Sequence, residues 1–463
     1  MKKIISGLFI ILIIFLISLL TILSTFGIET DKFNNLISNK INEFNKNAKI
    51  ELSTVKFKID IKEISLFLET KDPSINYRNV TVPAKNIKVY VDFLSLLKTN
   101  PKIEKITILF KKIDIVQLKK LSVAFKPSNL RSFLNNNVML GKLDSEIELF
   151  LNKDNLLDNF IARGEVVNLK TKIKSNLIFE KTKFSFFADK SDILIKNIFS
   201  ESGPIKIFDG DLKVNFGDEI SVISNFDSKI NYDLSFKDFL NFFNFIDLTR
   251  NITNLEANLK NSFQINFDKT YKLKEHNFKT GGKIIAADLT FNKPFKSEVI
   301  GDKINKVSLR NSEINLNYGS NKNNQSILGY YLLNDNKPLN FNLQSSIKND
   351  MLKLKFEADY NNLIKLDIIN YKKIKNSKSK VSLNLTKNKD NITLNDLNLS
   401  DEKNIIYVKD LKLKKNKFLS FREISVKTFK NEKKNNDFKI SYGKKIKIRG
   451  THFDANNLPK IFN

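Results

Sequence analysis

An uncharged apolar stretch near the N-terminus constrains this chain more than any other feature. Residues 4–28 read IISGLFIILIIFLISLLTILSTFGI, without a single acidic or basic side chain. A helix of that length extends about 37 Å, which is more than the roughly 30 Å of a bilayer's hydrocarbon core. Lys2 and Lys3 precede the stretch, so residues 1–3 are predicted to stay in the cytoplasm. The sequence therefore predicts a single-pass anchor with the rest of the chain across the membrane.

Two other interpretations of this stretch remain open, a cleaved signal peptide and a buried helix of a soluble protein. A signal peptide has a shorter apolar region that ends at small residues. Ser24-Thr25-Phe26 is a poor match to such a cleavage site. We therefore favour an uncleaved anchor, and no second span is predicted.

A short amphipathic helix is predicted directly after the anchor, over residues 29–48. Its apolar side chains recur at helical spacing, at Phe33, Leu36, Ile37, Ile41 and Phe44. This face could lie on the membrane surface or pack against the first sheet. We favour packing against the sheet.

From residue 49 onward the apolar residues recur at every second position. This period is typical of strands with one apolar and one polar face. Asn- and Lys-rich segments such as 321–325 and 387–391 separate the strands. The apolar positions that we expect to line one face are Val55, Phe57, Ile59, Ile87, Val89, Val91, Phe263, Ile265, Phe267, Leu352, Leu354, Phe356, Leu383 and Leu385.

The predicted fold is mainly β: an N-terminal transmembrane helix followed by an elongated, curled antiparallel sheet with a few short helices. These helices are expected at Phe93–Lys98, Asn129–Asn135 and Ser235–Asp247. The last could be a mobile lid or a packed core helix, and we favour the core. Ile113–Ile115 is expected to continue a strand. Composition shows no boundary within residues 49–463, so we treat them as one domain.

The continuous apolar face needs a cover, because exposing it to water costs about 25 cal/mol per Å². A second sheet would make a closed sandwich. A curled, open-sided sheet would bind an apolar ligand such as acyl chains. Periodicity alone does not separate these alternatives.

The sequence offers little for catalysis or metal binding. There is no cysteine, and His276 and His452 are the only two histidines. Metalloprotease, P-loop, nucleophile-elbow and dinucleotide motifs are absent. The formal charge of +28 comes largely from lysines dispersed along the strands. Lys, Asn and Ile are all abundant, as is typical of AT-rich codons, so codon usage explains much of the lysine excess. We therefore predict no enzyme activity, cofactor, metal or nucleic-acid partner.

The order of these features resembles the AsmA-like superfamily, which includes YhdP and TamB. Besides the basic start and single span, segment 86–115 resembles the family's strand, "vdllsLl" turn and following strand, with Lys111 or Lys112 where a proline is usual. Segment 141–169 resembles a YhdP-type region. Segment 411–458 contains IRGTHFDA, which is similar to an "i.G..fDa" element.

The resemblance implies an apolar β-groove, anchored in the inner membrane of a Gram-negative cell, that extends into the periplasm. It also implies phospholipid movement to the outer membrane and a role in envelope biogenesis. The expected partners are phospholipid acyl chains, the inner membrane and other envelope proteins. Larger relatives continue past the Phe453-Asp454-Ala455 element, so we expect a short or truncated member. The alternative is a non-transporting envelope scaffold or outer-membrane assembly factor with a closed sandwich.

Overall fold

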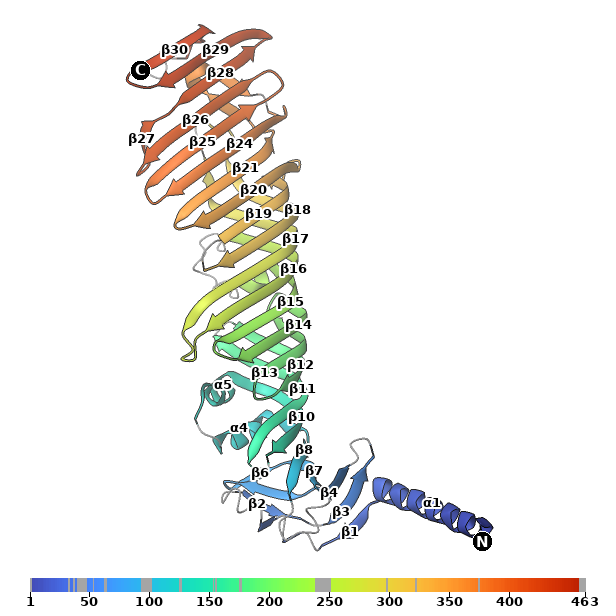
Figure 1. Ribbon diagram of the computed structural model, residues 1–463. Helices are drawn as coiled ribbons and strands as arrows, with labels where there is room; N and C mark the ends of the chain where they lie inside the picture. The colour runs from blue at the N-terminus through green and yellow to red at the C-terminus, as the bar shows by residue number, and fades with distance from the viewer. Residues whose placement is uncertain are drawn as a thin grey trace. The chain divides into compact units, whose positions relative to one another are not determined.

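Antiparallel strands dominate the computed structural model (Figure 1). Strands account for 69% of the chain and helices for 12%, and the large sheet contains 25 strands, which confirms the predicted mainly β class. The structure describes residues 2–31, 34–35, 38–39, 48–52, 54–61, 65–92, 102–124, 127–152, 154, 156–174, 177–237, 251–296, 299–320, 323–373 and 375–457. The helix predicted at 93–98, and most of those predicted at 29–48 and 235–247, lie outside these residues.

The N-terminal helix α1 spans Lys2–Thr25 and ends earlier than the predicted anchor. Gly27, with φ of +70°, redirects the backbone, and strand β1 follows at Ile28–Thr30, where the amphipathic helix was expected to begin. Residues 34–35 and 38–39 are helical. Most described apolar side chains of α1 are exposed, as at Phe9, which is 63% exposed, whereas Leu23 near its end is buried. Helix α1 is long and apolar enough to cross a membrane. Because so little of it is buried, it is not a core helix of this chain.

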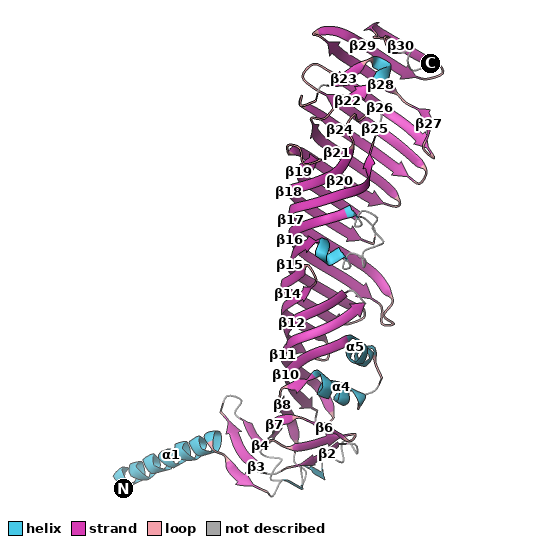
Figure 2. Ribbon diagram, turned by 180° about the vertical axis from the view of Figure 1, so that it is seen from behind, coloured by secondary structure: helices cyan, strands magenta, loops and turns pink. Residues whose placement is uncertain are grey.

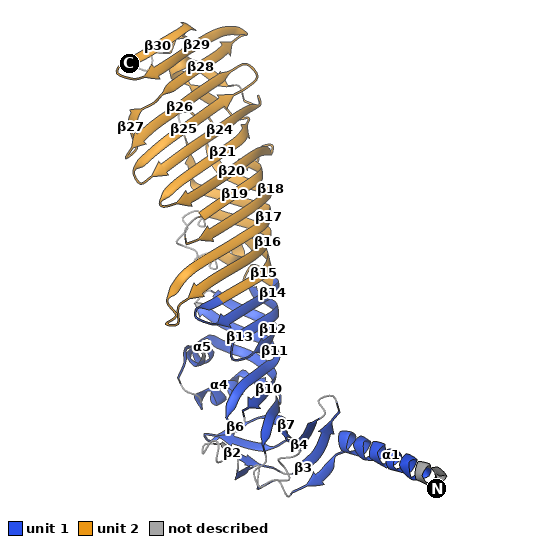
Figure 3. Ribbon diagram, in the orientation of Figure 1, with its two compact units in different colours: residues 1–202, 208–221 blue, residues 203–207, 222–463 orange. Residues whose placement is uncertain are grey.

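The chain divides into two compact units (Figure 3): residues 1–202 with 208–221, and residues 203–207 with 222–463. In the first unit the main sheet pairs strands in the order β1, β3, β4, β7, β8, β10, β11, β12, β13, and β9 pairs with one end of β10. Their bounds are β3 Val55–Asp60, β4 Ser65–Lys71, β7 Ala84–Val91, β8 Ile103–Phe110, β9 Ile113–Asp114, β10 Val138–Leu151, β11 Leu157–Lys174, β12 Leu177–Ala188 and β13 Asp192–Ser202.

A second, small sheet and two helices complete the first unit. The small sheet comprises β2 (Ala48–Glu51), β5 (Ser74–Tyr77) and β6 (Val80–Val82). Helix α5 (Asn129–Asn137) confirms the helix predicted at Asn129–Asn135 (Figure 2). Strand β9 confirms Ile113–Asp114 of the strand expected at Ile113–Ile115, and α4 (Ile115–Val123) begins at its last residue. Asp114 begins α4, because its side chain accepts a 2.8 Å hydrogen bond from the Gln117 amide.

In the second unit, most strands pair with their sequence neighbours. The order is β16 to β21, then β24, β25, β26, β28, β29 and β30, with β27 beside one end of β26. Their bounds are β16 Ile252–Phe267, β17 Leu273–Phe295, β18 Ile304–Gly319, β19 Asn323–Leu333, β20 Leu339–Lys348, β21 Met351–Tyr360, β24 Ser379–Asn388, β25 Asn391–Ser400, β26 Ile405–Lys414, β27 Lys417–Ser420, β28 Glu423–Lys430, β29 Lys433–Tyr442 and β30 Ile446–His452.

The remaining elements lie in a short insertion after β21 and at the boundary between the two units. Strands β22 (Ile364–Leu366) and β23 (Tyr371–Lys373) form a separate pair, joined by the 3₁₀ turn η4 (Asp367–Ile369). The boundary between the units falls within β14 (Ile205–Phe216) and β15 (Ile220–Asp233). The turn η1 (Leu234–Phe236) is the described part of the helix predicted at Ser235–Asp247.

Tight turns and bulges shape the strands. The pairs Asn349-Asp350 and Asn431-Glu432 both have positive φ at their two residues, as type I′ hairpin turns require. Successive strands β11 to β14 each carry one residue of positive φ in their interior, namely Asn168, Lys181, Asn197 and Asp209. The register shifts beside the first three of these residues. Such bulges bend a strand, so these strands are not straight.

A buried ion pair fixes strands β3, β4 and β7 on their polar face. Lys58 Nζ lies 2.7 Å from Glu69 Oε2, and Asn86 Nδ2 donates a 2.6 Å hydrogen bond to Glu69 Oε1. Burial acts to raise the pKa of Glu69, but the bonds from Lys58 and Asn86 outweigh it and lower the pKa. This carboxylate therefore stabilises the fold above its unfolded pKa of about 4.3. That contribution is lost as the pH falls through the lower folded-state pKa.

Replacing Glu69 by glutamine should destabilise the first unit by about 1–3 kcal/mol at pH 7, because Lys58 then lacks its counter-charge. The difference from the parent should shrink as the pH is lowered from 7 to 3. Urea unfolding of the full chain in detergent micelles at several pH values measures it. Exposed Glu432→Gln is the control and should change stability by less than about 0.5 kcal/mol. A Glu69→Gln effect of equal size at pH 7 and pH 3 would contradict this account.

Candidate functional site

The apolar face of the first unit is built from cross-strand rows. Phe57 on β3 lies opposite Leu68 on β4, which lies opposite Val89 on β7. Directly opposed residues in an antiparallel pair point to the same face, so these rows form one surface. The predicted residues Val55, Ile87, Val89 and Val91 are buried in this cluster, and Phe57 packs against it. Ile59 lies on the same face, opposite Leu66, and is half-buried.

Protein covers part of this first apolar surface. Ile50 of β2 is buried in the same cluster, and Ile75 of β5 packs against it. A cavity of about 220 Å³ lies there, and Thr70 is the only polar residue among the described residues that line it. The two sheets thus enclose an apolar space beside the strands that follow the N-terminal helix in sequence.

In the second unit, strands β21 and β24 bring four predicted residues into one apolar patch. Leu354 lies opposite Leu385, and Phe356 lies opposite Leu383. On the other side of β21, Phe356 faces Leu343 of β20. All five side chains are half-buried. We call Leu343, Leu354, Phe356, Leu383 and Leu385 the central apolar patch.

The remaining predicted residues lie on the same face but away from this patch. Phe263 on β16 lies opposite Phe278 with the ring centroids 6.0 Å apart, and Ile265 lies opposite His276. Phe267 ends β16 beside the turn into β17, opposite Leu273. Leu352 lies opposite Lys387 on β24, at the margin of the apolar surface.

A row of partly polar residues runs across the strands within the apolar face. The alternation of apolar and polar residues along single strands did not predict this row. The cross-strand row between β16 and β21 runs Asn261, Thr280, Leu316, Gln325, Ser345 and Leu354. Gln325 Nε2 donates a 2.6 Å hydrogen bond to Ser345 Oγ, and Thr280 Oγ1 donates one of 3.0 Å to Asn261 Oδ1. These bonds satisfy the polar groups within the surface. The face is therefore amphipathic here.

The C-terminal part of the apolar face is covered by the β22–β23 insertion. Ile364, Ile369 and Tyr371 pack against Val426 of β28 and Phe438 of β29 in one buried cluster. Burial raises the pKa of the Tyr371 hydroxyl well above its usual value, and nearby Asp401 adds to that shift. This cover makes a local protein core.

The Phe453-Asp454-Ala455 element closes the same core. The Phe453 ring lies 5.2 Å from that of Phe438. The Asp454 carboxylate accepts hydrogen bonds from Asn370 at 2.8 Å and Asn435 at 3.3 Å. Burial acts to raise the pKa of Asp454, but these bonds outweigh it and lower the pKa. The segment that resembled a family element is thus a structural clamp in this chain.

Metal and catalytic chemistry find little support among the described residues. Within these ranges, no group of three or more histidine and carboxylate side chains is placed to hold a metal ion. Half-buried His276 has its Nδ1 3.3 Å from Ser320 Oγ, and exposed His452 has its Nδ1 2.9 Å from Thr451 Oγ1. Within the described part of the chain, neither histidine forms a hydrogen bond to a carboxylate, as a nucleophile–base–acid arrangement requires.

Comparison with known proteins gave no match to any family model, curated protein or solved structure. The AsmA-like resemblance therefore stays a prediction, and the apolar face itself carries the functional argument.

Proposed function

We propose that this chain is an inner-membrane protein that binds phospholipid acyl chains on its apolar sheet face and carries lipid toward the outer membrane. Helix α1 would hold the chain in the inner membrane with its N-terminus in the cytoplasm and its bulk in the periplasm. Other envelope proteins would complete the route. No catalytic step is needed, because lipid would exchange between the face and the bilayers.

The observation that carries this proposal is the central apolar patch. Leu343, Leu354, Phe356, Leu383 and Leu385 lie on three adjacent strands and are only half-buried. Fully burying one such side chain contributes about 1.5–3 kcal/mol. Acyl chains laid on the patch would supply that burial without ordering further polypeptide.

The hydrogen-bonded row beside the patch fits the same ligand. A phospholipid is apolar along its chains and polar at its headgroup. Ser345 places a polar atom on the same face as the patch, directly beside Leu354, and Gln325 lies opposite Ser345 on the next strand. An amphipathic face suits an amphipathic ligand better than a purely hydrocarbon one.

A non-transporting scaffold is the second candidate, and the two covered regions favour it. The small β2–β5–β6 sheet covers apolar residues of the first unit, and β22–β23 covers those near β28 and β29. If the central apolar patch were covered by protein in the same way, the sheet would be a closed body. The two functions therefore differ in what contacts the patch.

A lipid-transfer assay tests the proposal against the scaffold. The full chain is reconstituted in donor vesicles that contain an acyl-labelled fluorescent phospholipid, and acceptor vesicles are added. We expect transfer at least tenfold faster than from donor vesicles without the chain. An unchanged rate with folded, correctly inserted chain would overturn lipid carriage and leave the scaffold.

A further inference from the structure

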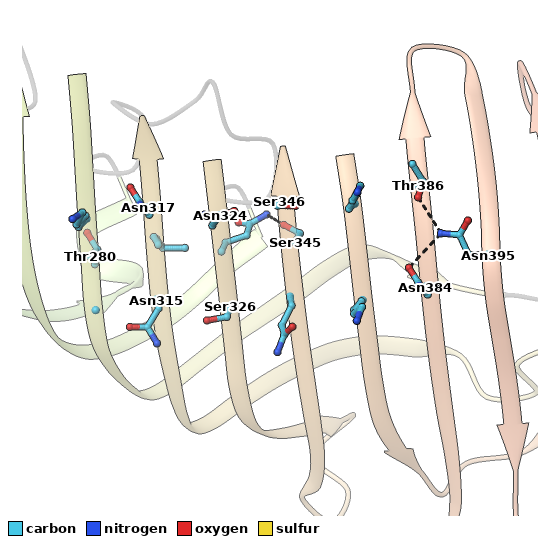
Figure 4. A pocket seen from close by; sticks show the side chains of 17 residues that line it. Thr280, Asn315, Asn317, Asn324, Ser326, Ser345, Ser346, Asn384, Thr386 and Asn395 are labelled. Atoms are coloured by element: carbon cyan, nitrogen blue, oxygen red, sulfur yellow. Dashed lines mark hydrogen bonds between the residues drawn. The ribbon is translucent and has the colours of Figure 1, made fainter. Parts of the chain in front are cut away.

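A trough on the polar face of the second unit is a separate feature from the apolar surface. It has a volume of about 850 Å³ and is lined by 17 residues of strands β17 to β25 (Figure 4). The backbone of Thr280, Leu316, Gln325 and Ser345 lies along its middle, since these residues point their side chains to the apolar face. Two parallel rows of polar side chains flank this line (Figure 4).

The two rows follow directly from strand register. One row crosses five strands as Asn315, Ser326, Gln344, Lys355 and Asn384. The other crosses six strands as Lys279, Asn317, Asn324, Ser346, Lys353 and Thr386. Strands lie about 4.8 Å apart, so the longer row spans about 24 Å. The strand spacing is close to the length of one pyranose unit in an extended glycan.

The charge of the trough is uniformly positive. Lys279, Lys353 and Lys355 line it, and the described lining residues include no acidic side chain. Among the described residues, none of these three lysines forms an ion pair. Elsewhere on the sheet such pairs do form, as between Arg310 and Asp288 at 2.7 Å. An ordinary solvated sheet face tends to place opposite charges across strands, so the trough departs from that pattern.

The uncharged side chains that line the trough indicate which class of ligand it suits. Amides and hydroxyls supply both hydrogen-bond donors and acceptors, as a chain of sugar hydroxyls requires. None of the 17 described lining residues has an aromatic ring. Single-stranded nucleic acid is bound largely by base stacking on aromatic side chains, so the trough does not suit it. Apolar side chains are also nearly absent from the lining, which disfavours acyl chains.

We propose that this trough binds an anionic glycan, with the lysines pairing its carboxylate or phosphate groups and the amide rows bonding its hydroxyls. The extended chain would lie across the strands, parallel to the two rows. Asn395 Nδ2 already donates a 3.0 Å hydrogen bond to Thr386 Oγ1 at the β25 end, which orients that end of the trough (Figure 4). This binding is independent of lipid carriage, because it uses the opposite face of the sheet.

Calorimetric titration of the full chain in detergent micelles tests the proposal. The probes are an oligogalacturonate of six units and a neutral glucan of the same length. We expect the charged oligosaccharide to bind at least tenfold more tightly than the neutral one. Equal affinities, or no oligogalacturonate binding at millimolar concentration, would overturn the proposal.

Two sets of variants separate a built site from general attraction to a basic protein. Lys353→Glu with Lys355→Glu should weaken oligogalacturonate binding at least tenfold. Lys412→Glu with Lys414→Glu makes the same charge change at the same spacing on β26, outside the trough, and should change affinity less than twofold. Equal losses in the two double variants would mean only non-specific charge attraction and would overturn the proposal.

A charge-neutral variant and two other anions complete the test. Asn317→Ala with Asn324→Ala should weaken oligogalacturonate binding about threefold to tenfold, while the circular dichroism spectrum stays unchanged. A thymidine oligonucleotide and vesicles containing phosphatidylglycerol should bind the parent and the Lys353/Lys355 variant with affinities within threefold. A tenfold loss for either anion, without oligogalacturonate binding, would assign the trough to that anion instead.

Discussion

Replacing Leu354 by glutamate lowers the phospholipid recovered with the purified full chain at least tenfold, if the central apolar patch binds acyl chains. Leu354 lies between Ser345 and Leu385 and is half-buried. A carboxylate there would have to be desolvated by every bound acyl chain, which costs several kcal/mol. A tenfold loss of bound lipid corresponds to about 1.4 kcal/mol of binding free energy. The desolvation cost is larger than this, so tenfold is the smallest loss that we expect.

The matched control is the neighbouring exposed residue on the opposite face. Lys355→Glu introduces the same side chain one position away and should leave lipid recovery within twofold of the parent. Mass spectrometry of solvent extracts counts the lipid after exchange of the chain into amphipathic polymer. Urea unfolding shows whether each variant remains folded. A folded Leu354→Glu variant with full lipid content would contradict acyl-chain binding at this patch.

Replacing Asn436 by alanine destabilises the C-terminal core by about 3 kcal/mol. Asn436 is completely buried, at 0% exposure. Its Nδ2 donates 2.8 Å bonds to the Ile369 carbonyl and to Thr428 Oγ1, and its Oδ1 accepts a 2.9 Å bond from the Asp454 amide. The alanine leaves these three groups without that partner, and each buried unsatisfied group costs about 1–3 kcal/mol.

Asn435→Ala provides a graded comparison for this prediction. Asn435 is half-buried, and its bonds to Asp454 and Thr428 are 3.3 and 2.8 Å long. Water can reach this position, so the cost should be about 1 kcal/mol. Equilibrium urea unfolding of both variants measures the difference. Equal stability losses, or none at Asn436, would contradict the clamp described for the Phe453-Asp454-Ala455 element.

The strands were predictable from the sequence because apolar and polar residues alternate along each of them. The apolar residues between Leu352 and Tyr360 predict a strand, and β21 spans Met351–Tyr360. The Asn- and Lys-rich turns were predictable for the same reason, since positive φ in tight hairpins favours Asn. The strand predicted at Ile113–Ile115 is confirmed at Ile113–Asp114, which form β9, but not at Ile115, whose β-branched side chain also resembles a strand residue locally. The Asp114 cap instead begins α4 there.

The cover of the apolar face was not predictable from periodicity. Parity assigns Val89 and Leu354 to apolar faces, but it does not show that Ile50 and Ile75 cover the first of them. The polar row through Gln325 and Ser345 was missed because it depends on register across several strands. The trough was missed for the same reason, because Lys353 and Lys355 look like ordinary exposed strand residues along one strand.

Photo-crosslinking along β21 tests the central claim most directly. A benzophenone amino acid is placed singly at each position from Leu352 to Glu357 in the full chain, in membranes that contain radiolabelled phospholipid. Acyl-chain binding predicts phospholipid adducts at Leu354 and Phe356 and none at Lys353, Lys355 or Glu357. Adducts at neither face, adducts at both faces alike, or crosslinks from Leu354 and Phe356 only to polypeptide would contradict it.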